Sequence, residues 1–378
     1  MKRLRAALLV GALGLLQGCA TAPVAPAGAD HAPDAIDEAG LWQVMAREEA
    51  QIRDLGLRER DPALQAYVDQ LTCRLAGDLC GDIRVYVLRL PYFNATMAPN
   101  GMMQLYTGLL LRCESEAQLA SVLGHEISHY RMRHSLNNWR RTRRTADALL
   151  AFNLIGGIGN AGAVGYLLSA GVAGATLARF SREQEAEADA QSGALLAQQG
   201  IALQPAVALW RGALAEEQAN PKGFLSAIFA DHPATTARIN ALQALAAATA
   251  APPRAGPDPW GVLWQRFAPT WLDDEIGRRN YQQSQALLAR LEGFPAGGAE
   301  VLRARGDLLR LRGAPGDLQQ AVSAYRKALA GGAAAQTWRQ LGLTLRRLAR
   351  HAEARDAFLR YLEAVPDAPD RALIESYR

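Results

Sequence analysis

Two histidines and one glutamate lie within five residues of this 378-residue chain, at a spacing that can hold a catalytic metal ion. The stretch "LGHEISHYRMRH" contains His125, Glu126 and His129. On a helix, residues 125 and 129 are separated by about 40° around the axis and by one turn, so both imidazoles can reach one ion. Glu126 lies on the flank of this face, where it can hold and deprotonate a water molecule at the metal. The spacing is the zincin pattern, which predicts one catalytic Zn²⁺ ion.

A catalytic zinc ion needs a third protein ligand in addition to an open position. His134 is one candidate, but a continuous helix would place it about 180° from His125, so we expect a structural role for it. A metzincin arrangement would also require glycine and histidine where this chain has Met132 and Ser135.

Other carboxylate candidates lie in residues 181–197, "SREQEAEADAQSGALLA". Glu185 and Asp189 share one face of the helix expected here, and Glu183 and Glu187 share nearly the opposite face. Either face can offer a carboxylate to zinc, and periodicity alone does not choose between them.

The elements that must position these residues follow from hydrophobic periodicity and turn residues. Residues 83–90 predict a strand, and residues 94–110 predict two short strands about a turn at 99–101. Helical spacing from Ser115 predicts one helix that continues through the histidines. Further helices are expected over residues 36–53, 62–76, 180–200 and 204–219, and one more within "DHPATTARINALQAL". The sequence therefore predicts an α+β, mostly α domain with a small sheet over residues 40–248.

Residues 148–178 contain no charged residue, and the run is long enough to span a bilayer. Asn153, Asn160 and the cluster "GGIGNAG" interrupt it, so we expect two apolar helices folded back near the active site. Contact of this segment with a membrane stays an open alternative.

A linker is predicted at residues 249–259 and helical repeats at residues 260–378. Apolar and aromatic positions recur there at a 33-residue spacing, and Gly306 is matched by Gly342. The matched positions are Ala321 with Ala354, Tyr325 with Phe358 and Ala328 with Tyr361. This pattern resembles the tetratricopeptide repeat, and the alternative is an ordinary helical bundle.

The N-terminus has the features of a secretory signal. A basic start precedes an apolar run over residues 6–16, and Cys19 follows Gly18. This resembles a bacterial lipoprotein signal peptide over residues 1–18, with Cys19 lipidated and residues 19–39 as a flexible tether. Ala20 after the cysteine favours, by the same resemblance, the outer membrane of a Gram-negative bacterium. The chain is thus expected in the periplasm, attached to the membrane through its lipid.

Charge and cysteine content fit that compartment. Removal of three basic residues from 41 leaves 38 Lys+Arg against 37 Asp+Glu, which argues against a nucleic-acid partner. Cys73 and Cys80 are seven residues apart and can pair where the compartment is oxidising. Pairs that include Cys113 are alternatives that the sequence leaves open.

Three stretches, "NATMAPNG", "LASVLGHEISH" and "SREQEAEADAQSG", together resemble the zinc metallopeptidase family of CAAX prenyl proteases and their soluble bacterial relatives. The resemblance covers residues 40–245 and extends loosely to members that join a protease to tetratricopeptide repeats. It implies that Glu185 binds zinc and that Asp189 accepts the outer N–H of a ligating histidine. It also implies that Arg238 stabilises the oxyanion, the alternative being a surface helix residue. The clear membrane spans of the family's membrane members are missing, so cleavage of prenylated peptides is not expected.

His232, before Pro233, is the sole histidine of residues 40–248 outside the zinc helix. Either it is a surface or capping residue, or it reaches the active site. In the second case it donates a hydrogen bond to the oxyanion, or it takes the fourth zinc position and makes the enzyme latent.

We therefore expect a zinc endopeptidase that cleaves misfolded, unfolded or stalled envelope proteins, with an extended substrate added to the strand near Asn94–Ala98. The repeats are expected to bind partners, among them the outer-membrane assembly machinery. The competing hypothesis is a non-enzymatic periplasmic chaperone or assembly scaffold for outer-membrane proteins. An intact His-Glu-x-x-His core argues against it, because a structural zinc site does not need Glu126.

Overall fold

The architecture was obtained as a computed structural model, and it confirms an α+β, mostly α fold. The predicted signal peptide, Cys19, residues 150–178 and most of the predicted linker lie outside the described residues. The structure describes residues 26–33, 35–149, 180–220, 232, 235–249 and 259–377.

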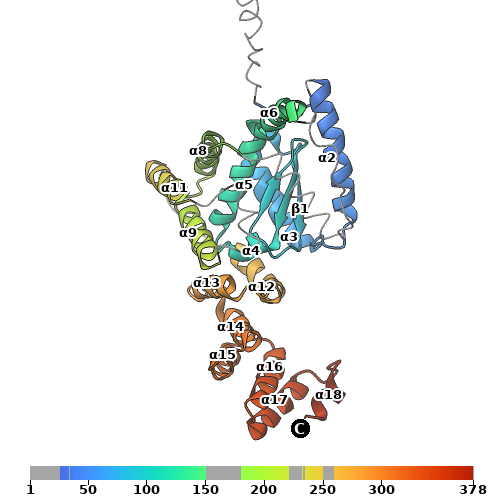
Figure 1. Ribbon diagram of the computed structural model, residues 1–378, viewed down its shortest axis with the longest axis vertical. Helices are drawn as coiled ribbons and strands as arrows, with labels where there is room; N and C mark the ends of the chain where they lie inside the picture. The colour runs from blue at the N-terminus through green and yellow to red at the C-terminus, as the bar shows by residue number, and fades with distance from the viewer. Residues whose placement is uncertain are drawn as a thin grey trace, which may run out of the picture.

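A small sheet forms the centre of the N-terminal half (Figure 1). Its order is β1 (Arg84–Leu88), β3 (Met102–Tyr106) and β2 (Ala95–Met97), with β1 parallel and β2 antiparallel to β3. The two short strands predicted over residues 94–110 are β2 and β3, which form an antiparallel hairpin. Gly101 at its turn has φ +86°, and a Cβ there would lie 2.0 Å from the carbonyl oxygen of Asp82, so only glycine fits. β2 is consequently the outermost strand on one side of the described sheet.

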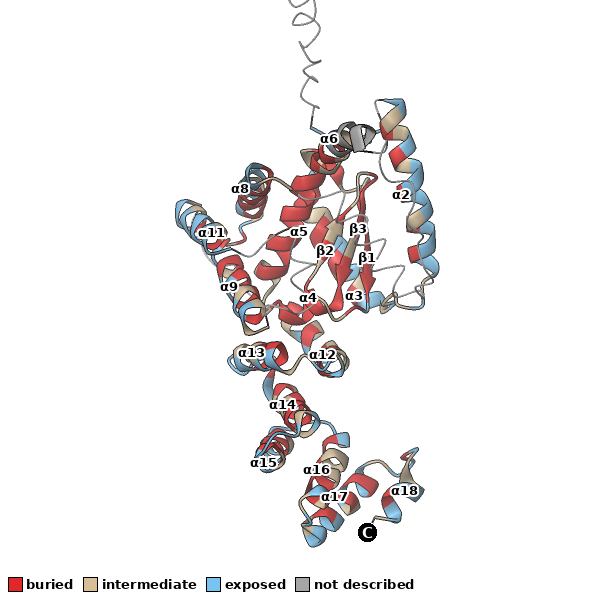
Figure 2. Cartoon of the chain, in the orientation of Figure 1, coloured by how far each residue is buried: buried red, intermediate tan, exposed pale blue. Residues whose placement is uncertain are grey.

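Alternation along the strands buries both faces of the sheet. Tyr86, Leu88 and Met102 pack with Ile52 of helix α2 (Ile36–Asp54) on one face. The intervening residues of β1 and β3 face the other way, and Figure 2 shows the strands and α5 as mostly buried. There they pack against α3 (Pro62–Ala76) and α5 (Glu116–Arg131). Helix α5 therefore lies between the sheet and the helices that follow it.

Both helices beside the sheet begin at side-chain caps. Asp61 accepts hydrogen bonds from the backbone N–H groups of Ala63 and Leu64 and precedes Pro62 at the first helical position. Ser115 caps α5, and the short helix α4 (Thr107–Arg112) comes directly before it. The start of α3 and its end at Ala76 agree with the predicted range.

The helix that carries His125 and His129 is shorter than expected. α5 ends at Arg131, Arg133 has φ +55°, and a new helix, α6 (His134–Leu149), begins at once. The prediction of one continuous helix through His134 is therefore wrong. A left-handed residue reverses the chain locally, which a helical periodicity count cannot detect.

Helix α8 (Arg182–Gln198) packs along α5. A Cβ on Gly124 would lie 2.8 Å from Ser192 Oγ, and that hydroxyl donates to the backbone oxygen of Ser121 at 3.0 Å. The glycine before His125 therefore allows the close approach of the two helices. α9 (Gln204–Ala219) and α11 (Thr236–Ala248) complete this layer.

The C-terminal helices extend away from the sheet domain (Figure 1). The same close contact of a glycine with an aromatic ring occurs in two helical hairpins. A Cβ on Gly306 would lie 2.4 Å from the ring of Tyr325, and a Cβ on Gly342 would lie 2.4 Å from the ring of Phe358. The 33-residue pattern thus corresponds to a repeated packing of helix pairs, and its assignment to tetratricopeptide repeats stays a prediction. The helices are α12 (Pro259–Gly277), α13 (Tyr281–Leu291), α14 (Gly298–Arg312), α15 (Asp317–Ala330), α16 (Gln336–Arg347), α17 (His351–Ala364) and α18 (Arg371–Glu375).

A buried ion cluster joins the two halves. Arg112 at the end of α4 lies 2.7 Å from Glu216 of α9 and 3.1 Å from Glu275 of α12, and all three side chains are fully buried. Removing one member of such a cluster typically costs about 3–5 kcal/mol, because a charge is left buried without its partner. The predicted boundary at residue 260 therefore separates segments that share buried charges.

Three further expectations concern the ends and the cysteines. A disulfide joins Cys73 and Cys80, and Cys113 is a buried thiol. Within the predicted tether, Ala27 is buried and its N–H donates to the carbonyl of Arg131 at 2.7 Å, so this residue packs on the end of α5. Among the described residues, none of the helices has the length and apolar character needed to cross a bilayer.

Candidate metal centre

Four side chains bring possible metal ligands together among the described residues. His125 and His129 of α5, Glu185 of α8 and His232 each offer one atom, and these atoms all lie within 4.8 Å of one another. The Nε2 atoms of the two α5 histidines are 3.0 Å apart. Glu185 reaches both, at 3.4 Å from His129 and 3.6 Å from His125. The helix pairing described above therefore converts two separate sequence motifs into one cluster.

This donor set fits zinc. Imidazole nitrogens and a carboxylate oxygen are the ligands of catalytic zinc sites, which keep three protein ligands and one open position. His125, His129 and Glu185 are each less than a tenth exposed, so the ligands are held by packing. Burial alone would raise the pKa of Glu185, but the charge of His232 and the hydrogen bond from His129 hold it well below its usual range. The carboxylate is thus kept ionised, as a ligand must be.

The outer nitrogen of His125 is fixed by Asp189. Asp189 Oδ1 lies 2.9 Å from His125 Nδ1, the contact that the resemblance implied. Arg238 donates to both oxygens of the same carboxylate, at 2.8 and 2.9 Å. Burial opposes ionisation of Asp189, but the Arg238 guanidinium holds its pKa well below its usual range. Such an arrangement selects the tautomer that leaves Nε2 of His125 available to a metal.

The outer nitrogen of His129 is met by His134. Because the chain turns at Arg133, His134 Nδ1 comes to 2.9 Å from His129 Nδ1, and its Nε2 lies 3.2 Å from Glu187. The 180° separation that we predicted for His134 is therefore wrong, although it stands outside the four-residue cluster. Glu187 is itself more than half exposed, and the Glu183 side chain is exposed as well. The face of α8 that is turned to the histidines is that of Glu185 and Asp189.

Glu126 lies beside the cluster without belonging to it. Its side chain is buried, and burial raises the pKa of its carboxyl. It lines a pocket next to the edge strand β2, where Asn94 and Ala95 also contribute. A carboxylate with a raised pKa next to a metal ligand set and an open strand edge has the geometry of a general base.

His232 and Arg238 both reach the site. His232 Nδ1 is 2.8 Å from Glu185 and 3.2 Å from His125 Nε2. The guanidinium of Arg238 lies 2.9 Å from Glu185 and stacks on the ring of Trp210 at 4.2 Å. Both side chains are mostly buried, so the alternatives of a surface residue are wrong for these two positions.

Sequence reasoning missed two aromatic residues of the site. Trp210 of α9 and Phe93 line the same pocket as Glu126, with their rings edge to face at 5.8 Å. No motif contains them, because Trp210 in an apolar helix and Phe93 just before a strand are each equally consistent with an ordinary core residue. The tertiary fold alone places them beside the catalytic residues.

Comparison with known proteins agrees with this geometry. The model of "Peptidase family M48" matches residues 58–246. A putative beta-barrel assembly-enhancing protease of Vibrio cholerae is 31% identical over 206 residues, covering 50% of this chain and 43% of that protein. The mitochondrial metalloendopeptidase OMA1 of Schizosaccharomyces pombe is 31% identical over 160 residues, covering 42% and 45%. The metalloprotease LoiP of Escherichia coli is 30% identical over 220 residues, covering 53% and 82%. The chain thus spans less than half the length of the first two relatives.

The two faces of α8 can be separated by metal analysis. We expect Glu185→Ala to lower the zinc content of the purified protein at least about tenfold, because it removes one of three protein ligands. Glu183→Ala, on the exposed face of the same helix, is the matched control and should retain zinc. Zinc retained in Glu185→Ala and lost in Glu187→Ala would show that the wrong face had been assigned.

Proposed function

Because the chain belongs to peptidase family M48, we propose that it is a zinc-dependent endopeptidase of the bacterial cell envelope. The observation that carries this proposal is the position of Glu126. It is buried next to the histidine pair, it is not one of the ligand candidates, and it opens onto a pocket beside an edge strand. A metal site that only stabilised the fold would not need this carboxylate.

The protein would hold zinc with His125, His129 and Glu185. When bound, zinc would act as a Lewis acid: it would polarise the scissile carbonyl and lower the pKa of water, so that a nucleophile forms at neutral pH. Glu126 takes the proton of the attacking water and passes it to the leaving amine, for which its raised pKa is suited. Arg238 acts on the site through the carboxylates of Asp189 and Glu185, which it holds in place.

An extended substrate would pair with β2. Asn94 accepts from the N–H of Tyr106, and the N–H of Ala98 donates to Met102. Antiparallel ladders alternate, so the backbone groups of Ala95 and Met97 point away from β3. A polypeptide added along this edge would place its carbonyls beside Glu126, and backbone pairing makes binding largely independent of sequence.

The cellular setting is proposed from the N-terminal sequence and from the names of relatives. Lipidation at Cys19 would attach the protein to the outer membrane on its periplasmic side. Several relatives are named for enhancing beta-barrel assembly, which supports misfolded or stalled envelope proteins as substrates. The repeated hairpins of the C-terminal region offer a surface for partners, among them the outer-membrane assembly machinery. A non-enzymatic scaffold is the alternative that the next experiment excludes or supports.

Replacement of the base tests the enzyme directly. We expect Glu126→Gln to lower hydrolysis of an unfolded protein substrate by at least about two orders of magnitude, because the amide cannot accept a proton. Zinc content and thermal unfolding temperature should stay those of the wild type. Glu183→Gln, at an exposed position, is the control and should keep full activity. Full activity of Glu126→Gln would contradict the mechanism, and an inactive wild-type protein with bound zinc would favour the scaffold.

His232 tests whether the enzyme is latent. Its Nδ1 lies within reach of Glu185 and His125, and it completes a set of four ligand candidates. A fourth protein ligand would occupy the position that the attacking water needs, so we expect His232→Ala to raise peptidase activity several-fold. His351→Ala, an exposed histidine of α17, is the matched control. A decrease by about two orders of magnitude would instead mean that His232 stabilises the transition state.

The lipid anchor has its own test. We expect Cys19→Ser to move the protein from the membrane fraction to the soluble fraction of lysed cells, because one thiol is the site of acylation. Immunoblots of both fractions provide the measurement. Continued membrane association of the variant would assign membrane contact to residues 148–178.

A further inference from the structure

The pocket beside Glu126 has an apolar wall. Phe93, Leu109, Val122 and Trp210 form this wall, and the rest of the lining is Asn94, Ala95, His125, Glu126 and His232. These four side chains offer no hydrogen-bonding group to a charged residue, apart from the indole of Trp210. An apolar substrate side chain that enters the pocket next to the scissile bond therefore gains free energy from burial against this wall.

The positions of two wall residues, Leu109 and Phe93, depend on each other. Gly108, next to Leu109 in α4, approaches the chain before Phe93 so closely that a Cβ would lie 2.3 Å from the backbone nitrogen of Tyr92. Gly108 also donates its N–H to the carbonyl of Leu90 at 2.9 Å. A displacement of α4 would consequently move both Leu109 and Phe93, and the pocket would change shape.

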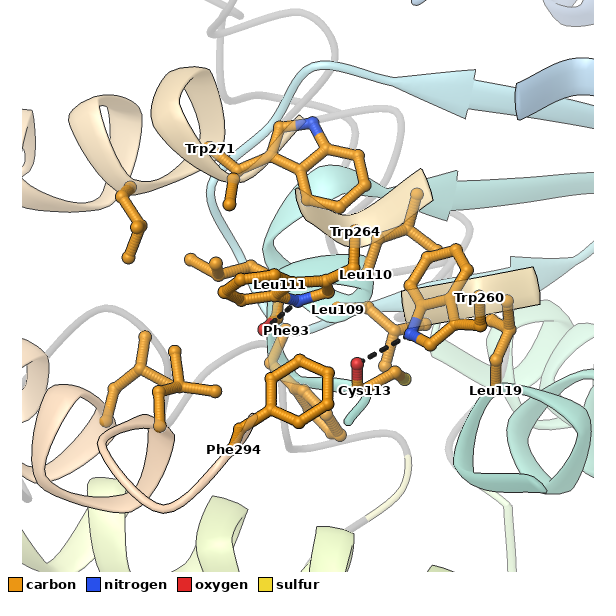
Figure 3. Close-up of a cluster of buried hydrophobic side chains, with 14 of the residues drawn as sticks. Phe93, Leu109, Leu110, Leu111, Cys113, Leu119, Trp260, Trp264, Trp271 and Phe294 are labelled. Carbon is orange, nitrogen blue, oxygen red and sulfur yellow. Dashed lines mark hydrogen bonds between the residues drawn. The ribbon is translucent and has the colours of Figure 1, made fainter. Parts of the chain in front are cut away.

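Helix α12 holds the C-terminal end of α4 through two hydrogen bonds. The indole N–H of Trp264 donates to the carbonyl of Leu111 at 3.0 Å, and that of Trp260 donates to the carbonyl of Cys113 at 2.7 Å (Figure 3). These carbonyls lie at the C-terminal end of α4, where a helix has no partners of its own for its last carbonyls. Both tryptophans are fully buried.

The same cluster reaches the pocket. Figure 3 shows Phe93 and Leu109–Leu111 packed among the tryptophans of α12 and Phe294. Phe294 meets Trp264 edge to face at 4.9 Å. α12 begins at residue 259, beyond the 58–246 range that matches the peptidase family and beyond the predicted peptidase domain.

We infer that α12 supports the substrate pocket through α4, with Trp264 and Trp260 as positioning residues that maintain a preference for an apolar side chain next to the scissile bond. The inference rests on the proposed peptidase function. It assigns to the start of the C-terminal region a part in substrate selection, in addition to the partner binding proposed for the repeats.

Paired peptides test this inference. Digestion with the wild-type enzyme locates the cleaved bond, and two peptides are then compared that carry leucine or alanine beside it. We expect the wild type to favour the leucine peptide at least about tenfold in kcat/KM. The loss of even one methylene from a side chain in a hydrophobic pocket typically lowers kcat/KM by about this factor. The Glu126→Gln protein should show the same preference in Kd, which gives a readout that does not need catalysis.

Trp264→Phe removes the indole N–H and keeps an aromatic ring. We expect it to reduce the leucine preference at least about threefold in both readouts, because the C-terminal end of α4 loses one of the two indole hydrogen bonds from α12. Trp271→Phe is the matched control, since Trp271 is equally buried on α12 but its indole N–H has no acceptor among the described residues. The control should keep the wild-type preference, whatever stability either variant loses.

The outcomes separate the two proposals. An unchanged preference in Trp264→Phe, or an equal change in Trp271→Phe, would overturn the role of α12. A wild type that cleaves both peptides equally would overturn the apolar pocket. A wild type that cleaves nothing, while the Glu126→Gln protein still binds leucine peptides more tightly, would overturn the peptidase function and leave the pocket in place.

Discussion

The close packing of α8 against α5 is the constraint on which the site depends. Gly124 leaves room for Ser192, so the helices approach until Glu185 and Asp189 face His125 and His129. Buried carboxylates and imidazoles are stable only when each has a partner. The Arg238 guanidinium keeps Asp189 ionised, whereas the charge of His232 and the hydrogen bond from His129 keep Glu185 ionised.

A chain of contacts leads from this cluster to the C-terminal region. Arg238 rests on Trp210 of α9, and Glu216, farther along the same helix, pairs with Arg112. Arg112 also meets Glu275 of α12. Because all of these groups are buried, movement of α12 relative to α4 or α9 would leave a charge without its partner. Buried ion pairs thus join the peptidase helices to the first C-terminal helix.

In the proposed mechanism, substrate access depends on two features of the same fold. The edge of β2 offers backbone groups, whereas His232 occupies the space in front of the histidine pair. We propose that His232, at 3.2 Å from His125, restrains a protease that binds backbone with little sequence preference. The apolar pocket then adds selectivity at one side chain.

The sequence by itself determined the reacting groups and most elements. The His-Glu-x-x-His spacing, the capped helices and the hairpin around Gly101 are local features, so periodicity and turn chemistry are sufficient for them. Periodicity left open which face of α8 meets α5, and only the family resemblance pointed to Glu185 and Asp189 before the tertiary structure placed them there. The tertiary structure alone decided that His134 turns back onto His129. It also decided that Trp210 and α12 form the pocket and its support. These contacts join segments 5 to about 150 residues apart, and their formation depends on how buried surfaces fit, which no local pattern encodes.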